Sequence, residues 1–142
     1  MKVVLDTNVL VSGLLTPFGS SGEIVRMVIS NGLKLLLDAR ILSEYRDVLR
    51  RPKFCFSPED VAVLLEYIKH YGQFVPGSPL SAPLPDRDDE PFLEVALAGK
   101  AAAFITANAI HFPENSRKGV RLLSPTEFLE FYRNMVTTQI NN

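Results

Sequence analysis

Short apolar runs alternate along this chain with longer segments in which apolar residues recur at helical spacing. Runs such as 3–5 and 35–37 are too short for helices and too continuously apolar for half-exposed strands, so they indicate strands buried on both faces. The expected strands are 3–5, 35–37, 73–75, 102–106 and 120–123. The alternation predicts an α/β fold: a three-layer α/β/α sandwich around a central, mostly parallel sheet of four to five strands.

Helix start and stop signals lie between these strands. Ser57 precedes Pro58 and an apolar stripe, and Ser124-Pro125-Thr126-Glu127 has the pattern of a capping box. The segment 72–85 contains four prolines, which predicts an extended connector over the surface after a short edge strand. We expect one domain over residues 1–136, followed by a polar, frayed C-terminal tail at 137–142.

Composition narrows the class of protein. With 142 residues, 46% hydrophobic and 22% charged, the chain is typical of a soluble globular domain. No apolar run approaches the roughly 20 residues that span a bilayer, and no cleavable leader begins the chain, so we expect a cytoplasmic protein without membrane contact. The single cysteine, Cys55, excludes an internal disulfide, and its two phenylalanine neighbours favour a buried thiol. A net charge of −1 means that nucleic-acid binding would need a local basic patch.

Asp6 is the first candidate for chemistry. It ends the first buried strand and precedes a turn into a helix, which is where open α/β sheets place their ligands. An aspartate there can equally cap the helix that follows. Asp38 ends the second strand in the same way, and we assign it only a capping role.

Two further acidic features follow Asp6. Glu44 lies at the border of the apolar face of the helix expected at 40–51, where it is either half-buried over the sheet or solvated. The run 86–90 holds four carboxylates at the start of another helix, although one cap needs only one of them. Such a run is often simply solvated, but a divalent cation would relieve its repulsion, and Mg²⁺ takes carboxylate ligands.

Four segments together resemble the PIN-domain ribonucleases, in particular the branch that contains toxins of toxin–antitoxin systems. The segments, in the expected order, are VLDTNVL at 4–10, LSEY at 42–45, PDRDDEPFLEVA at 85–96 and ITAN at 105–108. The resemblance covers nearly the whole chain and implies a PIN-like fold.

The resemblance also implies a metal-binding acidic pocket. It assigns catalytic and metal-binding roles to Asp6, Glu44 and Asp89, with Asp86 as a further metal ligand and Mg²⁺ or Mn²⁺ as the ion. Asn108 stands where the family has a fourth acid, so the pocket has one negative charge fewer. The residues that would orient carboxylates or bound water are Thr7, Asn8, Ser12 and Asn108.

The implied activity is metal-dependent endoribonuclease hydrolysis of phosphodiester bonds in single-stranded or structured RNA. The implied partners are an RNA substrate, a cognate antitoxin protein and a second copy of the chain in a homodimer. Candidate RNA-binding residues are Arg46, Arg50, Arg51 and Lys53, or Arg117, Lys118 and Arg121.

Alternative functions fit the sequence less well. An inactive PIN-like scaffold that binds RNA or a partner protein is the main alternative. An aspartyl-phosphate phosphatase would need an acid where Asn8 stands, and a dinucleotide-binding turn would need glycines after the first strand. Nothing near Cys55, His70 or His111 supports a Cys–His hydrolase.

Overall fold

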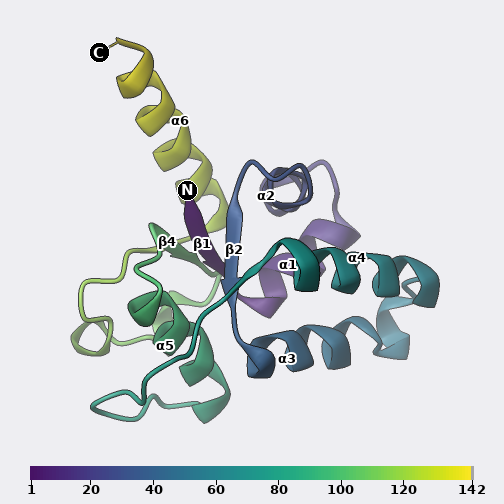
Figure 1. The fold of residues 1–142 in the computed structure, drawn as a ribbon, viewed down its shortest axis with the longest axis horizontal. Coiled ribbons are helices and arrows are strands. Elements are labelled where there is room, and N and C mark those ends of the chain that lie inside the picture. The colour runs from purple at the N-terminus through teal and green to yellow at the C-terminus, as the bar shows by residue number, and fades with distance from the viewer. Residues whose placement is uncertain (142) are drawn as a thin grey trace.

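The computed structural model describes residues 1–141 and has a five-stranded parallel sheet at its centre, with strand order β3-β2-β1-β4-β5 (Figure 1). The strands are β1 (Lys2–Leu5), β2 (Lys34–Leu37), β3 (Gln73–Phe74), β4 (Ala103–Ile105) and β5 (Leu122–Leu123). Every pairing between neighbouring strands is parallel. Together with the flanking helices, this confirms the expected α/β fold.

Six α-helices connect and cover the strands of the described chain. They are α1 (Thr7–Leu15), α2 (Ser20–Ile29), α3 (Ala39–Leu49), α4 (Pro58–Tyr71), α5 (Glu90–Ala98) and α6 (Pro125–Asn141). Short 3₁₀ turns are η1 (Pro52–Phe54), η2 (Arg87–Asp89), η3 (Ala109–His111) and η4 (Glu114–Ser116). The expected capping box is present, because the backbone N–H groups of Glu127 and Ser124 each bond to the other residue's side chain.

The direction of the crossovers divides the helices between the two faces of the sheet. From β1 the chain moves through α1 and α2 to β2, and through α3 and α4 to β3, always in the same direction across the sheet. It then returns through α5 to β4 on the other side of β1. Because such crossovers are right-handed, α5 lies on the opposite face from α1–α4, as Figure 1 shows. The strand order therefore reverses between β1 and β4, where α/β sheets bind ligands.

The central strands lie in an apolar core, as their sequences predict. Residues 3–5 of β1 and all three residues of β4 are fully buried. On the α5 side, the ring of Phe92 stacks on Phe104 with 5.9 Å between centroids, and Phe112 packs edge-on against Phe104 at 4.9 Å. These rings fix α5, and with it the acidic segment just before it, against β4.

Two local expectations are wrong. The thiol of Cys55 is exposed, because Cys55 has a left-handed backbone conformation at the end of η1 and its neighbours Phe54 and Phe56 stack on each other instead. Of the tail expected at 137–142, residues 137–141 continue α6, which projects away from the other layers (Figure 1), and residue 142 lies outside the described residues. Among residues 1–141, no helix combines the length and apolar character that a membrane crossing requires.

Candidate active site

The adjacent carboxyl ends of β1 and β4 place Asp6 beside Thr106. Leu5 pairs with Ile105 in the sheet, and the backbone N–H of Asp6 donates to the Ile105 carbonyl at 3.0 Å. The Thr106 hydroxyl donates to Oδ2 of Asp6 at 2.7 Å and accepts from the backbone N–H of Asn108 at 3.0 Å. Asp6 and Thr106 are both buried, so this chain of hydrogen bonds fixes the orientation of the Asp6 carboxylate.

Burial raises the pKa of Asp6 above its usual value. The hydrogen bond from Thr106 and the backbone N–H groups of Asn8 and Thr7 oppose that shift, because they stabilise the ionised carboxylate. Asp6 is the N-cap residue of α1, where these N–H groups stabilise its charge without forming a side-chain capping hydrogen bond of full geometry. Its carboxylate is oriented mainly by Thr106.

Glu44 reaches the same edge of the sheet from α3. Its neighbour Tyr45 is fully buried and donates its phenolic O–H to the Leu5 carbonyl at 2.7 Å, which ties α3 to the end of β1. The Thr7 hydroxyl donates to Oε2 of Glu44. Partial burial raises the pKa of Glu44, the Thr7 bond lowers it, and the charge of Asp6 raises it further. The sequence left open whether Glu44 is half-buried or solvated, and in the structure it is half-buried.

Asp89 ends η2, directly before α5, and has the most perturbed environment of the three acids. Burial raises its pKa to about 6, and the charges of Asp6, Asp86 and Glu44 contribute to that rise, whereas His111 lowers it. Oδ2 of Asp89 is buried and has no hydrogen-bond partner among the described residues. The nearest base, Nδ1 of His111, is 3.3 Å away without hydrogen-bond geometry. A buried carboxylate oxygen of this kind calls for a positive partner.

The charges of three acids from separate elements act on one another. Asp6 raises the pKa of both Glu44 and Asp89, and Glu44 raises that of Asp89. Within residues 1–141, however, no three Asp, Glu, His or Cys side chains are arranged to hold a metal as they stand. Hydroxyl groups occupy one oxygen of Asp6 and one of Glu44. The donors suit a hard cation, but their side chains would have to rotate to bind one together.

The other residues expected to bind the metal or orient the carboxylates differ in whether their side chains reach the three acids. Asp86 is exposed and caps η2 by accepting from the Asp88 backbone N–H at 2.9 Å. Asn8 and Asn108 contribute backbone N–H groups rather than side chains. Ser12 lies exposed on α1, and its side chain makes no hydrogen bond within the described chain. Thr7 contacts a site carboxylate, as expected of a residue that orients one.

The four basic residues proposed for RNA binding are divided among separate surfaces. Arg46 and Arg50 line a hollow between α3 and α4 together with Lys69. Lys53 packs over the ring of Phe54 on η1, 5.1 Å from its centroid. Of these four residues, only Arg51 lines the groove that contains Glu44. The structure therefore does not bring the four together as one basic patch.

Two residues of this site, Thr106 and His111, are not among those expected from the sequence. Thr106 directly follows β4 and lies beside Asp6, so the register of the two strands could have identified it. His111 lies in η3, and no periodic pattern points to it. Its position depends on the turn after β4, which the sequence alone does not define.

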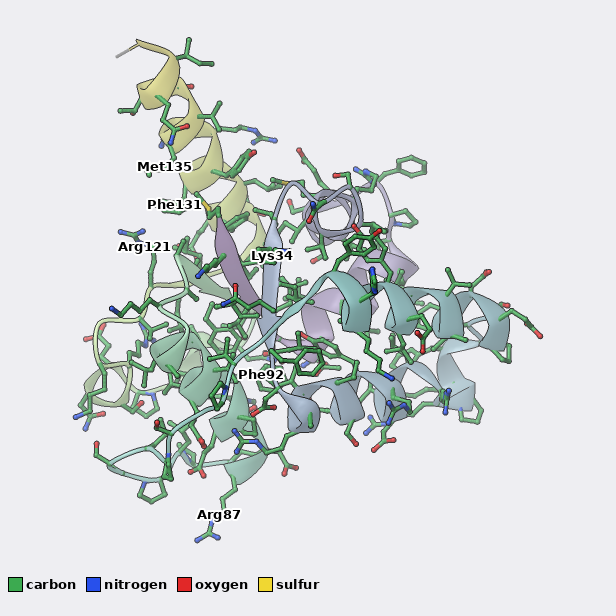
Figure 2. All side chains as sticks on the ribbon, in the orientation of Figure 1. Lys34, Arg87, Phe92, Arg121, Phe131 and Met135 are labelled. Carbon is green, nitrogen blue, oxygen red and sulfur yellow. The ribbon has the colours of Figure 1, made fainter. Side chains whose placement is uncertain are left out.

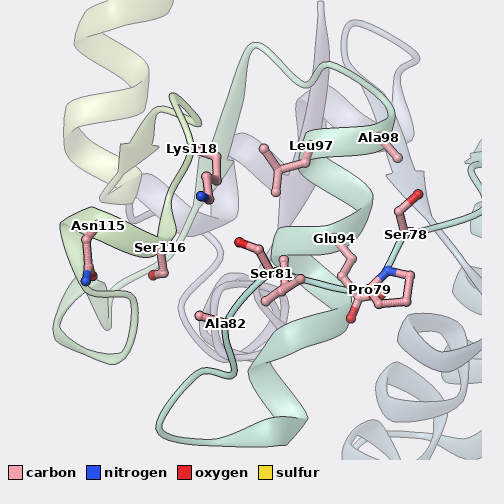
Figure 3. Close-up of a pocket in the computed structure, with 11 residues that line it drawn as sticks. Ser78, Pro79, Ser81, Ala82, Glu94, Leu97, Ala98, Asn115, Ser116 and Lys118 are labelled. Carbon is pink, nitrogen blue, oxygen red and sulfur yellow. The ribbon is translucent and has the colours of Figure 1, made fainter.

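A separate cavity of about 310 Å³, lined by both polar and apolar side chains, lies on the outer side of α5 (Figure 3). Glu94 of α5, Ser78 and Ser81 of the connector, and Lys118 of the loop after η4 contribute to its lining. The Glu94 carboxylate is buried and pairs with Arg40 at 3.3 Å. None of the acids that surround Asp89 lines this cavity, so it is distinct from the acidic cluster.

Comparison with known proteins agrees with this geometry. The family model of the PIN domain matches residues 2–109, which include β1 to β4 and every acid of the cluster. A search of curated proteins finds no match to the chain. Because the family model covers more than half of the sequence, the chain belongs to the PIN-domain family.

Proposed function

We propose that this protein is a divalent-metal-dependent endoribonuclease that hydrolyses phosphodiester bonds in single-stranded or structured RNA. The PIN domain is a nuclease-type fold. The observation that carries the proposal is the buried Oδ2 of Asp89, which has no hydrogen-bond partner in the described chain and lies near two other carboxylates. The charges of these carboxylates repel one another, and His111, with Nδ1 3.3 Å from Oδ2, offsets that repulsion only in part, whereas a bound cation would neutralise it.

Asp6, Glu44 and Asp89 are the residues that would hold Mg²⁺ or Mn²⁺, with Asp86 close enough for its charge to act on Asp89. A bound divalent ion supplies positive charge to a phosphate and lowers the pKa of a coordinated water. Because its pKa is about 6, Asp89 is mostly ionised above neutral pH. Thr106 and Thr7 hold the carboxylates of Asp6 and Glu44, and both hydroxyls can remain bonded to the oxygen that does not face the ion.

We further propose that the protein acts as the toxin of a toxin–antitoxin pair and forms a homodimer. Support comes from apolar side chains left exposed around α1, α2 and α4. Phe18 is 96% exposed and Val63 70% exposed, and a hollow of about 410 Å³ between these helices is lined mainly by apolar residues. Exposed apolar surface of this kind marks protein-binding faces.

A cleavage assay tests the nuclease proposal. Wild type, Asp6→Asn and Asp89→Asn are incubated with labelled RNA in Mg²⁺, in Mn²⁺ and in EDTA, beside Glu66→Gln as a control at an exposed acid of α4. We expect metal-dependent cleavage by wild type and the control, and a loss of about 100-fold or more in the two site variants. Equal cleavage by all four proteins would indicate a contaminant. No cleavage by any of them would favour the inactive scaffold that binds RNA or a protein.

A further inference from the structure

We propose that a groove between α3 and the η2–α5 junction binds the sugar–phosphate backbone of the RNA next to the scissile bond, with Arg51 and Arg87 as its phosphate-binding residues. This inference rests on the proposed ribonuclease function and specifies where the substrate lies. The groove has a volume of about 550 Å³. Glu44, Asp47 and Arg51 line one wall, and Arg87 and Asp88 line the other.

The groove is continuous with the acidic cluster. Glu44 lines the groove and is also one of the three coupled acids, while Asp88 on the opposite wall directly precedes Asp89. A strand lying in the groove would therefore contact Glu44 directly and would lie one residue along the chain from Asp89 at its opposite wall. The cavity behind α5, by contrast, contains none of the three acids.

The arginines of this groove differ in whether they form ion pairs with carboxylates. Arg40 pairs with Asp38 at 2.6 Å and with Glu94 at 3.3 Å. Arg51 and Arg87 are exposed and form no ion pair with any described residue. Figure 2 shows Arg87 extending into solvent at the lower edge of the molecule. Guanidinium groups bind phosphate in a bidentate manner, so these two residues have the chemistry that a backbone requires.

The spacing between Glu44 and Arg51 indicates which phosphate of the RNA Arg51 would contact. Arg51 follows Glu44 by seven positions and lies one residue beyond the C-cap of α3, which places their backbones about 10 Å apart along the helix axis at 1.5 Å per residue. Arg51 would therefore contact a phosphate beside the scissile one, not the scissile one itself. It is a substrate-positioning residue.

Acids on the groove walls limit how binding can work. Four acids line the groove beside three arginines, so the groove as a whole has no net positive charge; the acids are Glu44, Asp47, Asp88 and Glu90. Affinity must come from local arginine contacts and not from a broad positive field. Two phosphate contacts to a single strand predict a modest salt dependence, with each contact contributing about 0.7 to the slope of log K against log salt.

Arg46 and Arg50 provide matched controls. They belong to the same part of the chain as Arg51 but face α4, where they line a different hollow with Glu66 and Lys69. A purely electrostatic attraction of RNA to this region would treat Arg46, Arg50 and Arg51 alike. Binding in the groove would depend on Arg51 and Arg87 alone.

RNA-binding measurements in EDTA test this inference without depending on cleavage. The anisotropy of a fluorescent, short single-stranded RNA is titrated with wild type, Arg51→Gln, Arg87→Gln and the double variant, and with Arg46→Gln and Arg50→Gln, at several salt concentrations. We expect each groove variant to weaken binding about 3- to 10-fold and to reduce the salt slope by about 0.7. The two controls should stay within about twofold of wild type.

Other outcomes separate this inference from the nuclease proposal. Loss of affinity in the Arg46 and Arg50 controls equal to that in the groove variants would overturn the groove, as would wild-type affinity in the double variant or no RNA binding by wild type. If binding depends on Arg51 and Arg87 but wild type cleaves no RNA with Mg²⁺ or Mn²⁺, the groove stands and the nuclease proposal fails.

Discussion

The hydroxyl of Thr106 donates a 2.7 Å hydrogen bond to Oδ2 of Asp6, although the two residues are 100 positions apart in the sequence. The bond joins the carboxyl ends of β1 and β4, where the strand order of the sheet reverses. It also lowers the pKa of Asp6 against the effect of burial. Thr106 therefore both orients the carboxylate and helps to keep it ionised.

Replacing Thr106 with valine removes this donor at nearly constant volume. We expect RNA cleavage to fall about 10- to 100-fold, because partners that orient metal ligands have effects of that size. The acid limb of the pH–rate profile should move to higher pH, since the Thr106 bond lowers the pKa of Asp6 and its loss raises it. Thr106→Ser, which keeps the hydroxyl, is the control. A valine variant with reduced activity but an unchanged acid limb would show that Thr106 is structural only.

Asp89→Asn should stabilise the metal-free protein at neutral and higher pH. The pKa of Asp89 is raised to about 6, so the folded state keeps a proton that the unfolded state loses near pH 4. The stability of wild type therefore falls as pH rises from about 4 to about 6 and stays lower above that range. We expect asparagine to recover about 1–2 kcal/mol at pH 8 and much less at pH 4.

Urea denaturation in EDTA at the two pH values measures this difference. Glu66→Gln, at an exposed acid, should match wild type throughout. With Mn²⁺ in excess the order should reverse, because the ion stabilises only the protein that binds it. An equal gain at both pH values would mean that the charge of Asp89 does not cause the effect.

The layers of the fold are predictable from the sequence because each depends on local pattern. Buried parallel strands have continuous apolar runs, and the Ser57 and Ser124 caps carry their own side-chain signals. The largely polar composition of 137–141 did not reveal that these residues continue α6. The prediction of a buried Cys55 thiol is wrong because the aromatic neighbours of Cys55 pack on each other instead of over the thiol.

The acids of the candidate site could be proposed from sequence, but their surroundings could not. Asp6 follows a predictable strand and Asp89 precedes a predictable helix, so the sequence shows where each lies in its element. Thr106 depends on strand register, and the separation of Arg46 from Arg51 depends on how α3 packs between α4 and the start of α5. Those relationships join distant segments, and a single sequence contains no local signal for them.

A homodimer is expected in solution, formed through the apolar surface around α1, α2 and α4. We expect light scattering at micromolar concentration to give the mass of a dimer. Phe18→Glu and Val63→Glu should shift it toward monomer, because each places a charge on surface that association would bury. Ile140→Glu changes an equally exposed apolar residue on α6 and should leave the dimer intact. A wild-type protein that is monomeric under these conditions contradicts the expectation.

We expect residue 108 to affect how tightly the acidic cluster binds a cation. Its backbone N–H donates to the Thr106 hydroxyl, which in turn bonds to Asp6, and its side chain makes no capping bond at the start of η3. An amide brings no charge. We therefore expect Asn108→Asp to bind Mn²⁺ or Mg²⁺ about 10-fold more tightly, with the gain depending on how well the site is shielded from water. Asn108→Ala should weaken cleavage much less than Asp6→Asn or Asp89→Asn, because its backbone N–H still holds Thr106. Calorimetric titration of the variants with Mn²⁺ measures the first effect. An Asn108→Asp affinity equal to that of wild type would place residue 108 outside the reach of the ion.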